Sequence, residues 1–526
     1  MRIAIPSRII AAALAVAVAP GLLRAESTPD HPLTVEAAVA LALEKNERII
    51  VERASVASAS EAVTGAKGAY DPVFELTGDW RNTTVPVNSS FSGAPAGKSA
   101  PTERILETGA SIEQLLPTGG VVTARAHAAR NTTNGAFSLL SPAYGTQVGV
   151  ELRQPLLRDR AFDTARFALR VASSELTRTG ASLRSEITDM VVAVERAYWK
   201  LVATRREVSV REEAVRLADE QVSETGSRIE SGEAPETEAS QPRSELERRR
   251  GELFAAREAA ARAESALKLL ILGADDAAWS EHFAPEDDPS LPVAPVDVAK
   301  SMEQALASRP ELVAAGAVVE RRRAETELAR NAVRPTLDAV VSYDKFGFAG
   351  SPNPAGTDPS GLPAQIPPGM EGTWTRSFDM LSEGRFSDAR AGVLFRIPIG
   401  NRSLRAVAAI AQNVTRQAEA DLAGVRKAIR AEVLDAAAAL DTGSQRIEAA
   451  RAARAAADVQ LTSEQERYHA GLSTNFLVLT RQNELSQARL NEISALTDYR
   501  AARIAMARAQ ASLLEERGIE VDERTR

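Results

Sequence analysis

The sequence predicts a mainly α-helical protein with a smaller β-barrel portion. Two observations lead to this fold class. One is an unbroken apolar heptad repeat in the first half of the chain, and the other is a set of alternating polar and apolar segments between long helical ones. A third observation, the recurrence of the whole pattern in the second half, doubles every element.

The heptad repeat runs from residue 183 to residue 232. Apolar side chains that recur every seven residues keep facing a partner only if the helix supercoils, so we predict a long coiled coil. A second row of small and polar residues, including Ala197, Thr204, Arg211 and Thr225, suits helices that pack closely or face water. An ordinary amphipathic bundle helix is the alternative, and the length of the repeat disfavours it. The repeat positions, which we call the heptad seam, are Ile187, Val194, Leu201, Val208, Val215, Val222 and Ile229.

Composition favours an elongated, exported protein. The 526 residues include only 4% aromatic but 25% charged side chains, which is typical of long helices with small interfaces. The net charge of −8 argues against a nucleic-acid partner. The chain has no cysteine, so neither disulfides nor a lipid-modified cysteine is expected.

The first 25 residues have the three parts of a secretory signal peptide. Arg2 and Arg8 precede an apolar run over residues 9–19, and a Pro-Gly pair and Ala25 follow. The apolar run is too short to cross a membrane, and no later run reaches about twenty apolar residues. We therefore expect cleavage near Ala25 and no transmembrane helix.

The first copy of the pattern is predicted over residues 26–273. A helix over 33–69 leads to a strand from residue 73, a hairpin over 105–129 and a strand over 146–154. The long helix 156–229 and the shorter helix 237–272 follow, with a turn at 231–235 between them. Residues 274–295 contain four prolines and clustered acids, so we interpret them as a linker.

The second copy is predicted over residues 296–526. Pairing Leu43 with Leu306 aligns Pro72 with Pro335 without a gap, and two further registers follow in the same order. The copy comprises a helix over 296–332, strands over 336–346 and 388–397, a long helix over 401–468 and a helix over 474–515. A loop rich in Gly and Pro separates the two strands. We interpret this agreement as an internal duplication.

The strands predict an oligomeric barrel. Two principal strands per copy give four per chain, and an open sheet edge is not stable in lipid. Three chains would supply twelve strands, an even number as in outer-membrane barrels. If the hairpin 105–129 joined the barrel, the count per chain would be six and twelve would be wrong. A small soluble β-subdomain on a helical stalk is the alternative.

Several local motifs occur in an order that resembles the TolC family of outer-membrane efflux proteins. They are residues 43–46 (LEKN), 70–72 (YDP), 154–157 (QPLL) and 467–474 (RYHAGLST), and the resemblance covers essentially the whole mature chain. It implies a homotrimer with a helical barrel crossing the periplasm of a Gram-negative bacterium and a twelve-stranded barrel in the outer membrane. It also implies a passive duct for drugs, small molecules or exported proteins in a tripartite efflux or type I secretion system. The implied partners are a periplasmic adaptor and an inner-membrane pump, and no cofactor is implied.

The resemblance places functional residues at the helical turns and at the ends of two strands. Pro155 and Pro398 stand where a strand changes into a long helix. The residues expected to meet the adaptor are Arg228, Ser231, Gly232 and Glu233 in the first copy and Arg467, Ala470, Gly471, Leu472, Ser473 and Thr474 in the second. For each glycine, a plain helix cap remains an equal alternative.

The pore gate is expected beside the second turn. Tyr468 and Glu238 occupy positions at which family members form a hydrogen bond that holds the inner helices shut, although Tyr468 could equally be a seam residue. An acidic ring is expected at Leu477 and Thr480, but the sequence has Phe476, Leu477 and Leu479 there. We therefore predict a closure formed by apolar side chains rather than by charge.

Other function classes fit less well. The four histidines are scattered without metal-ligand spacing, and there is no phosphate loop, dinucleotide fingerprint or nucleophile elbow. We therefore expect neither catalysis nor a metal. The stronger rival is a soluble periplasmic coiled-coil adaptor or structural rod without a pore.

Overall fold

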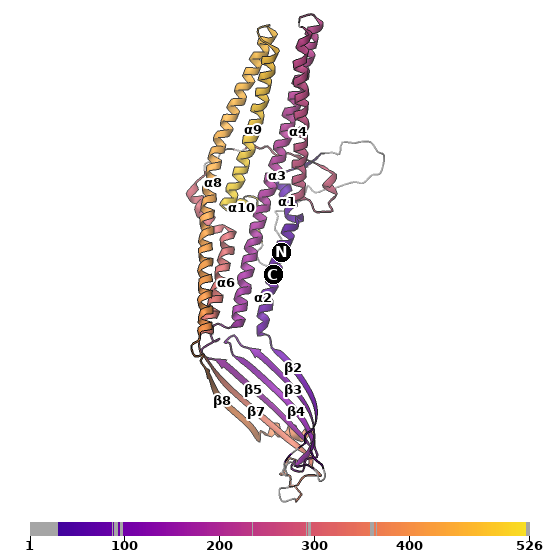
Figure 1. The fold of residues 1–526 in the computed structure, drawn as a ribbon, viewed down its shortest axis with the longest axis vertical. Helices are drawn as coiled ribbons and strands as arrows, with labels where there is room; N and C mark the ends of the chain where they lie inside the picture. The colour runs from indigo at the N-terminus through magenta and orange to yellow at the C-terminus, as the bar shows by residue number, and fades with distance from the viewer. Residues whose placement is uncertain are drawn as a thin grey trace, which may run out of the picture. The chain divides into compact units, whose positions relative to one another are not determined.

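The structure is a computed structural model that describes residues 30–521, apart from positions 87, 89–92, 95–97, 234, 291, 293–295, 358–361 and 364 (Figure 1). The predicted signal peptide, residues 1–25, lies outside the described residues. The described chain forms two compact units. We call residues 30–60, 175–318 and 418–521 the helical unit, and residues 61–174 and 319–417 the sheet unit.

The short helices of the two copies have matching bounds. Helix α1 (Val35–Lys45) and helix α2 (Glu47–Lys67) are followed by a 3-10 turn, η2 (Gly68–Tyr70). Their counterparts are α5 (Val298–Ser308) and α6 (Pro310–Ala332). The first and last residues of α1 and α5 agree at the offset that pairs Leu43 with Leu306, as the predicted duplication requires.

Each copy breaks the helix that the sequence predicts as continuous. The break falls at Asn46 in the first copy and at Arg309 in the second, and both have extended backbone angles. The amide of Asn46 caps the following helix by accepting from the Arg48 N–H at 3.0 Å. Arg309 precedes a proline, which disfavours the helical conformation, and its guanidinium pairs with Glu432 of α8 at 2.9 Å.

Both predicted long helices are present. Helix α8 (Arg402–His469) agrees with the predicted bounds to within one residue, whereas helix α3 (Thr164–Glu230) begins eight residues after the predicted start at 156. Each is followed by a shorter helix, α4 (Ser240–Ile271) after the 3-10 turn η3 (Glu236–Ala239), and α9 (Asn475–Ala509) before α10 (Leu513–Glu516). Figure 1 shows α3 beside α4 and α8 beside α9. Charged pairs join them, including Arg257–Glu212 at 2.9 Å and Arg454–Glu492 at 2.8 Å.

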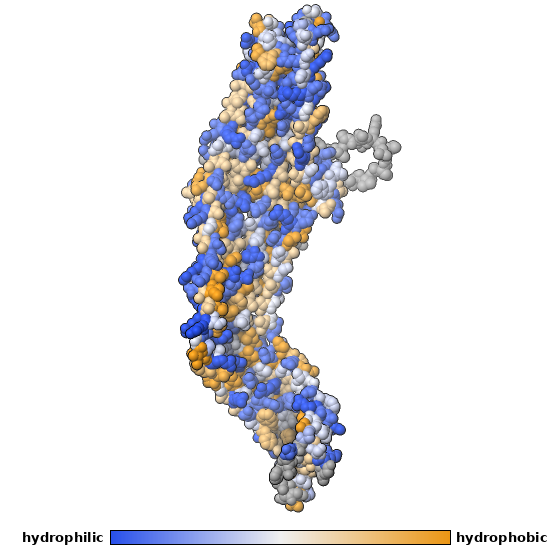
Figure 2. Space-filling view, in the orientation of Figure 1, coloured by the Kyte–Doolittle hydropathy of each residue, from blue (hydrophilic) through white to orange (hydrophobic). Residues whose placement is uncertain are grey.

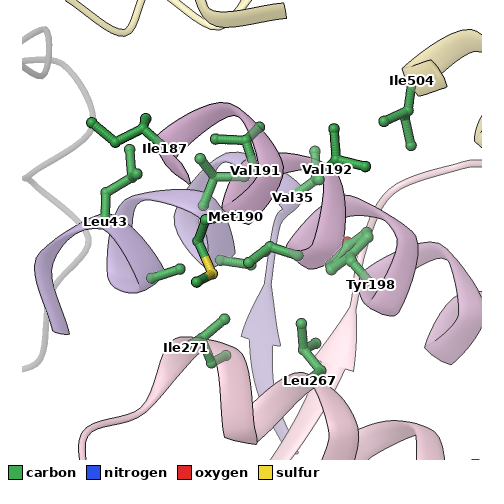
Figure 3. Packing of buried hydrophobic residues seen from close by; sticks show 14 of the residues in the cluster. Val35, Leu43, Ile187, Met190, Val191, Val192, Tyr198, Leu267, Ile271 and Ile504 are labelled. Carbon is green, nitrogen blue, oxygen red and sulfur yellow. The ribbon is translucent and has the colours of Figure 1, made fainter. Parts of the chain in front are cut away.

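The predicted heptad seam is the core of the helical unit over its first half. Ile187, Val194 and Leu201 are fully buried in one hydrophobic cluster with side chains from α1 and α4. Figure 3 shows part of this cluster, including Leu43 of α1 and Ile271 of α4. Beyond Leu201 the burial moves to the row that looked poor in the sequence, because Thr204 and Thr225 are each 2% exposed. The small residues of that row let α3 and α4 approach closely.

The predicted linker contains a short sheet. Strand β1 (Asp30–Leu33) pairs in parallel with β6 (His282–Pro285), which follows the 3-10 turn η4 (Ala277–Ser280). Tyr198 of α3 fixes this sheet, since its hydroxyl lies within hydrogen-bond distance of both the Leu33 carbonyl, at 2.8 Å, and Asp287, at 2.6 Å. The repeat and linker boundaries remain a prediction, because each copy contributes to both compact units.

The sheet unit contains one antiparallel sheet of six strands. They are β2 (Val73–Thr84), β3 (Thr102–Leu115), β4 (Val121–Thr133), β5 (Leu140–Pro155), β7 (Thr336–Pro352) and β8 (Phe386–Arg396), in that spatial order. The mainly helical fold class with a β portion is confirmed. The count of four strands per chain is corrected to six, because β3 and β4 form the predicted hairpin and pair fully with β2 and β5.

One helix in the sheet unit is absent from the prediction. Helix α7 (Trp374–Glu383) ends the Gly/Pro-rich segment between β7 and β8 and packs against β5 and β7. Thr146 of β5 lies 2.8 Å from the Ser377 hydroxyl, and the rings of Tyr144 and Trp374 are 4.9 Å apart. No alternation or heptad marks a helix of ten residues, so pattern analysis missed it.

Candidate functional site

The two helix-ending turns have the same backbone structure. After α3, Gly232 donates to the Ile229 carbonyl at 3.0 Å and Glu233 to the Arg228 carbonyl at 2.8 Å. After α8, Gly471 and Leu472 repeat both bonds at 2.9 and 2.8 Å. Both glycines have positive φ, 79° and 76°, as this type of helix cap requires. The duplication is therefore preserved at both turns.

Side chains join the ends of α3 and α8 beside these turns. The Arg228 guanidinium donates to the Tyr468 hydroxyl at 2.8 Å and also lies 5.3 Å from the centre of the Tyr468 ring. This hydrogen bond raises the pKa of Arg228. Two further contacts are Asn475–Thr225 at 3.3 Å and His469–Glu224 at 3.7 Å. Glu238 is the expected partner of Tyr468, and its negative charge also raises the pKa of Arg228.

The predicted gate residues divide into exposed and buried ones. Phe476 is 60% and Leu477 is 38% exposed, whereas Leu479 is buried and Thr480 is half-buried, with its hydroxyl donating to the Phe476 carbonyl at 2.8 Å. Phe476 and Leu477 thus present an apolar surface beside the second turn.

Most residues expected at the adaptor contact lie on the surface. Leu472 is 71% exposed, while Arg228 and Ser473 are half-buried. Ser473 is held by its bond to Glu464 of α8, which also pairs with Arg467 at 3.9 Å. The exposed positions are Ser231, Gly232, Glu233, Arg467, Ala470, Gly471 and Thr474.

The six-stranded sheet has one apolar face. The strand register places paired residues on the same side of the sheet. On one side, every strand except β4 exposes large apolar side chains. Strand β4 has Ala124 and Ala126 at these positions. Helix α7 packs on this face, which also carries Thr146. Figure 2 shows hydrophobic residues on the visible surface of the strands. The exposed apolar members are Phe74, Leu76, Trp80, Leu106, Ile112, Val148, Val150, Leu152, Val341, Tyr343, Val393 and Phe395.

The opposite face is polar and cross-linked by charged pairs. Arg125 of β4 forms a two-point ion pair with Asp344 of β7, at 3.1 and 2.8 Å, across β5. Gly149 of β5 stands between them in the register, and a Cβ there would lie only 1.9 Å from an Asp344 oxygen. Gln147 donates to the same carboxylate at 2.9 Å. Glycine at position 149 is therefore required for this network.

The strand-to-helix switches begin at prolines, as expected. Pro155 is buried at the end of β5, and the next residue continues the pairing, since the Leu156 N–H donates to the Leu337 carbonyl at 2.7 Å. Pro398 is exposed two residues after β8. The turn into α8 uses Asn401, whose φ is 40° and whose amide donates to the Val333 carbonyl at 3.0 Å.

The described residues contain no group of three potential metal ligands. Each histidine faces a single glutamate instead, for example His282 beside Glu264 at 3.2 Å. Within the part of the chain that the structure describes, no helix is long and apolar enough to cross a membrane.

Comparison with known protein families gives one match, in the second half of the chain. A family model described as outer membrane efflux protein matches residues 302–512. This part of the chain is therefore similar to the outer membrane efflux protein family. The match spans both strands and the long helix of the second copy, and the same elements recur in the first copy.

The fold of the chain is similar to that of solved membrane-protein structures. A membrane protein from Pseudomonas aeruginosa superposes with a TM-score of 0.61 at 19% identity, covering 90% of both chains. The Campylobacter jejuni outer membrane channel CmeC gives 0.62 at 14%, covering 91% of this chain and 86% of CmeC. The Vibrio cholerae outer membrane protein VceC gives 0.60 at 16%, covering 90% and 95%. No curated protein matches the sequence.

These findings confirm the predicted resemblance to the TolC family and its fold. Sequence patterns alone missed three features of the chain: helix α7, the Arg228–Tyr468 contact and the Arg125–Asp344 network. The last left a signal in the strict alternation of β4, where Arg125 and His127 each stand between two alanines.

Proposed function

We propose that the protein is the outer-membrane exit duct of a tripartite efflux or type I secretion system, conducting drugs, small molecules or exported proteins passively. The observation that carries this proposal is the two-faced sheet. Its apolar face exposes Trp80 and Phe395 at 65% and 59%, whereas its other face is bridged by ion pairs. Such a sheet suits lipid on one side and a water-filled lumen on the other.

A soluble adaptor or structural rod fits this sheet poorly. Soluble proteins rarely expose a continuous apolar patch over many neighbouring strands, because the exposed area raises the free energy in water and promotes aggregation. Here the patch extends from Phe74 on one edge strand to Val393 on the other. Lipid is the partner that removes this cost.

The duct works as a homotrimer with a periplasmic adaptor and an inner-membrane pump. The two glycine turns form the adaptor contact, because they expose short, similar backbone loops at the ends of paired helices. Leu472 supplies an apolar anchor there at 71% exposure. Arg228 and Tyr468 hold α3 to α8 in the closed state, and Phe476 and Leu477 of the three copies close the pore.

The proposal is tested by fractionation and electrophysiology. The expressed protein should sediment with the outer membrane, migrate differently on a gel before and after heating, and form channels in planar bilayers. A protein that stays soluble in the periplasm, or that yields no conductance after reconstitution, contradicts the proposal and favours the adaptor.

The gate is tested separately by Phe476→Ser and Leu477→Ser. Either change should raise the resting single-channel conductance, since a polar side chain lets water into an apolar constriction. Val459→Ser is a matched control, because Val459 is 70% exposed on α8. An unchanged current in the gate variants would remove the apolar closure from the proposal.

A further inference from the structure

The hairpin of β3 and β4 is a full member of the sheet. Strand β3 pairs with β2 at every residue from Val73 to Thr84, and β4 pairs with β5 from Val121 to Asn131. The apolar side of the sheet continues across it through Leu106 and Ile112. Both strands are therefore long enough to span a bilayer, which takes about 9–11 residues.

The turn of this hairpin is anchored at the end of the sheet where β5 leads into α3. Arg166 of α3 donates to the Pro117 carbonyl at 2.6 Å, and the Thr118 hydroxyl donates to Gln154 at 2.8 Å. Gly119 has a φ of 81°, and a Cβ there would approach the Asp159 carbonyl to 2.4 Å. These contacts fix the hairpin as a built part of the sheet.

The two edges of the sheet are long and open. Strand β2 is exposed at every residue except Thr83, and β8 is exposed at every residue. Each edge has a row of backbone N–H and C=O groups that no neighbouring strand of this chain takes up. An edge of this kind pairs readily with another strand, and within lipid it requires a partner.

The directions of the strands allow copies of this sheet to join. Every neighbouring pair in the sheet is antiparallel, and the number of strands is even, so β2 and β8 run in opposite directions. A copy that places its β2 beside the β8 of another copy therefore forms one more antiparallel pair. The apolar faces then lie on the same side.

We propose that β2 of one copy pairs with β8 of the next and that three copies close a barrel of eighteen strands, three times six. This inference rests on the proposed outer-membrane duct and deepens it. Barrel diameter grows roughly in proportion to strand number, and barrels of about 16–18 strands leave an aqueous channel. The barrel is about one and a half times as wide as one with twelve strands, and the Arg125–Asp344 network lines its lumen.

Cysteine cross-linking tests the junction directly, because the natural chain has no cysteine. Thr77→Cys on the polar side of β2 is combined in turn with Asp388→Cys, Arg390→Cys and Leu394→Cys on the polar side of β8. Under oxidation, at least one combination should give disulfide-linked dimers and trimers on a denaturing gel. Thr123→Cys on β4, with the same β8 partners, is the control and should give none, since β4 lies inside the sheet.

Cross-links from Thr123 instead of Thr77, or none from any Thr77 combination in outer-membrane trimers, would overturn the junction. Electron cryo-microscopy of the natural protein in detergent provides the second measurement. Eighteen strands with β2 beside β8 are expected, whereas a conducting trimer with twelve strands overturns the inference and leaves the duct intact. A protein that never reaches the outer membrane overturns the duct and the inference together.

Discussion

The helical unit and the sheet unit place their large apolar side chains in opposite positions. In the helical unit Ile187, Leu201 and Leu267 are fully buried, whereas in the sheet unit Leu76 and Val393 are 71% and 69% exposed. Both units are stable structures of one chain, so their surroundings must differ. The proposed duct accounts for this difference, because it places the first unit in water and one face of the second against lipid.

The largest expected effect concerns the buried seam. Leu201→Ala should lower the free energy of unfolding by about 2–5 kcal/mol, because it removes transfer energy and leaves a cavity in the core. Guanidinium unfolding followed by circular dichroism at fixed protein concentration measures this change. Leu269→Ala is the control, since Leu269 is 68% exposed on α4, and an equal loss there would mean that a neighbouring copy covers it.

The next effect tests the lipid-facing side of the comparison. Val150→Arg should destabilise the membrane-inserted sheet by about 2–4 kcal/mol, as charged residues do at the lipid face of barrels. Refolding into liposomes at graded urea concentrations measures the difference. Thr123→Arg places the same charge on the polar face and should change stability little. Equal effects at both positions would contradict the assignment of the two faces.

Gly149→Ala addresses the polar face itself. The new methyl group would collide with Asp344 and force the carboxylate away from Arg125, leaving both charges without their partner. We expect a loss of about 1–3 kcal/mol and altered ion selectivity, read from reversal potentials in bilayers. Gly145→Ala is a matched control on the same face of β5, because the nearest atom to its Cβ position is 3.9 Å away. Similar behaviour of the two variants would count against the network.

The smallest effect is a pH dependence in the helical unit. Burial and the hydrogen bond with Asp287 raise the pKa of Tyr198. The folded protein thus favours the protonated phenol, so this contribution is complete below pH of about 10 and declines as the pH rises further. Tyr198→Phe should cost about 1 kcal/mol at neutral pH and flatten the loss of stability above pH 10. Parallel unfolding curves for both proteins between pH 9 and pH 11 would refute this.

Much of the helical fold could be predicted from the sequence because duplicated patterns support one another. Matching Leu43 with Leu306 was enough to place α1 and α5 with equal bounds. The breaks at Asn46 and Arg309 were missed, since each depends on contacts with distant segments, such as the Asn46 amide with the Leu270 carbonyl at 3.1 Å. Apolar periodicity carries no information about such contacts.

Prediction of the site was weaker than prediction of the fold. The positions of the turn glycines could be predicted, because a helix-ending glycine follows a recognisable local rule. The roles of these glycines and of Tyr468 stay predictions. The partner Arg228 was assigned to the adaptor contact and not to Tyr468, because the pairing joins residues 240 positions apart. The number of strands per chain, four or six, was left open for a related reason. Whether a hairpin joins a sheet is decided by backbone pairing with its neighbours.

The anchored hairpin also bears on how such a protein can change over generations. The chain enters the hairpin after β2 and leaves it before β5 at the same end of the sheet. The hairpin therefore changes neither the direction of β2 and β5 nor the helices that follow them. Two strands can therefore be added to or removed from such a sheet without reversing any other strand. In the proposed duct, a change of this kind alters the width of the barrel and leaves the sequence of the helices as it is.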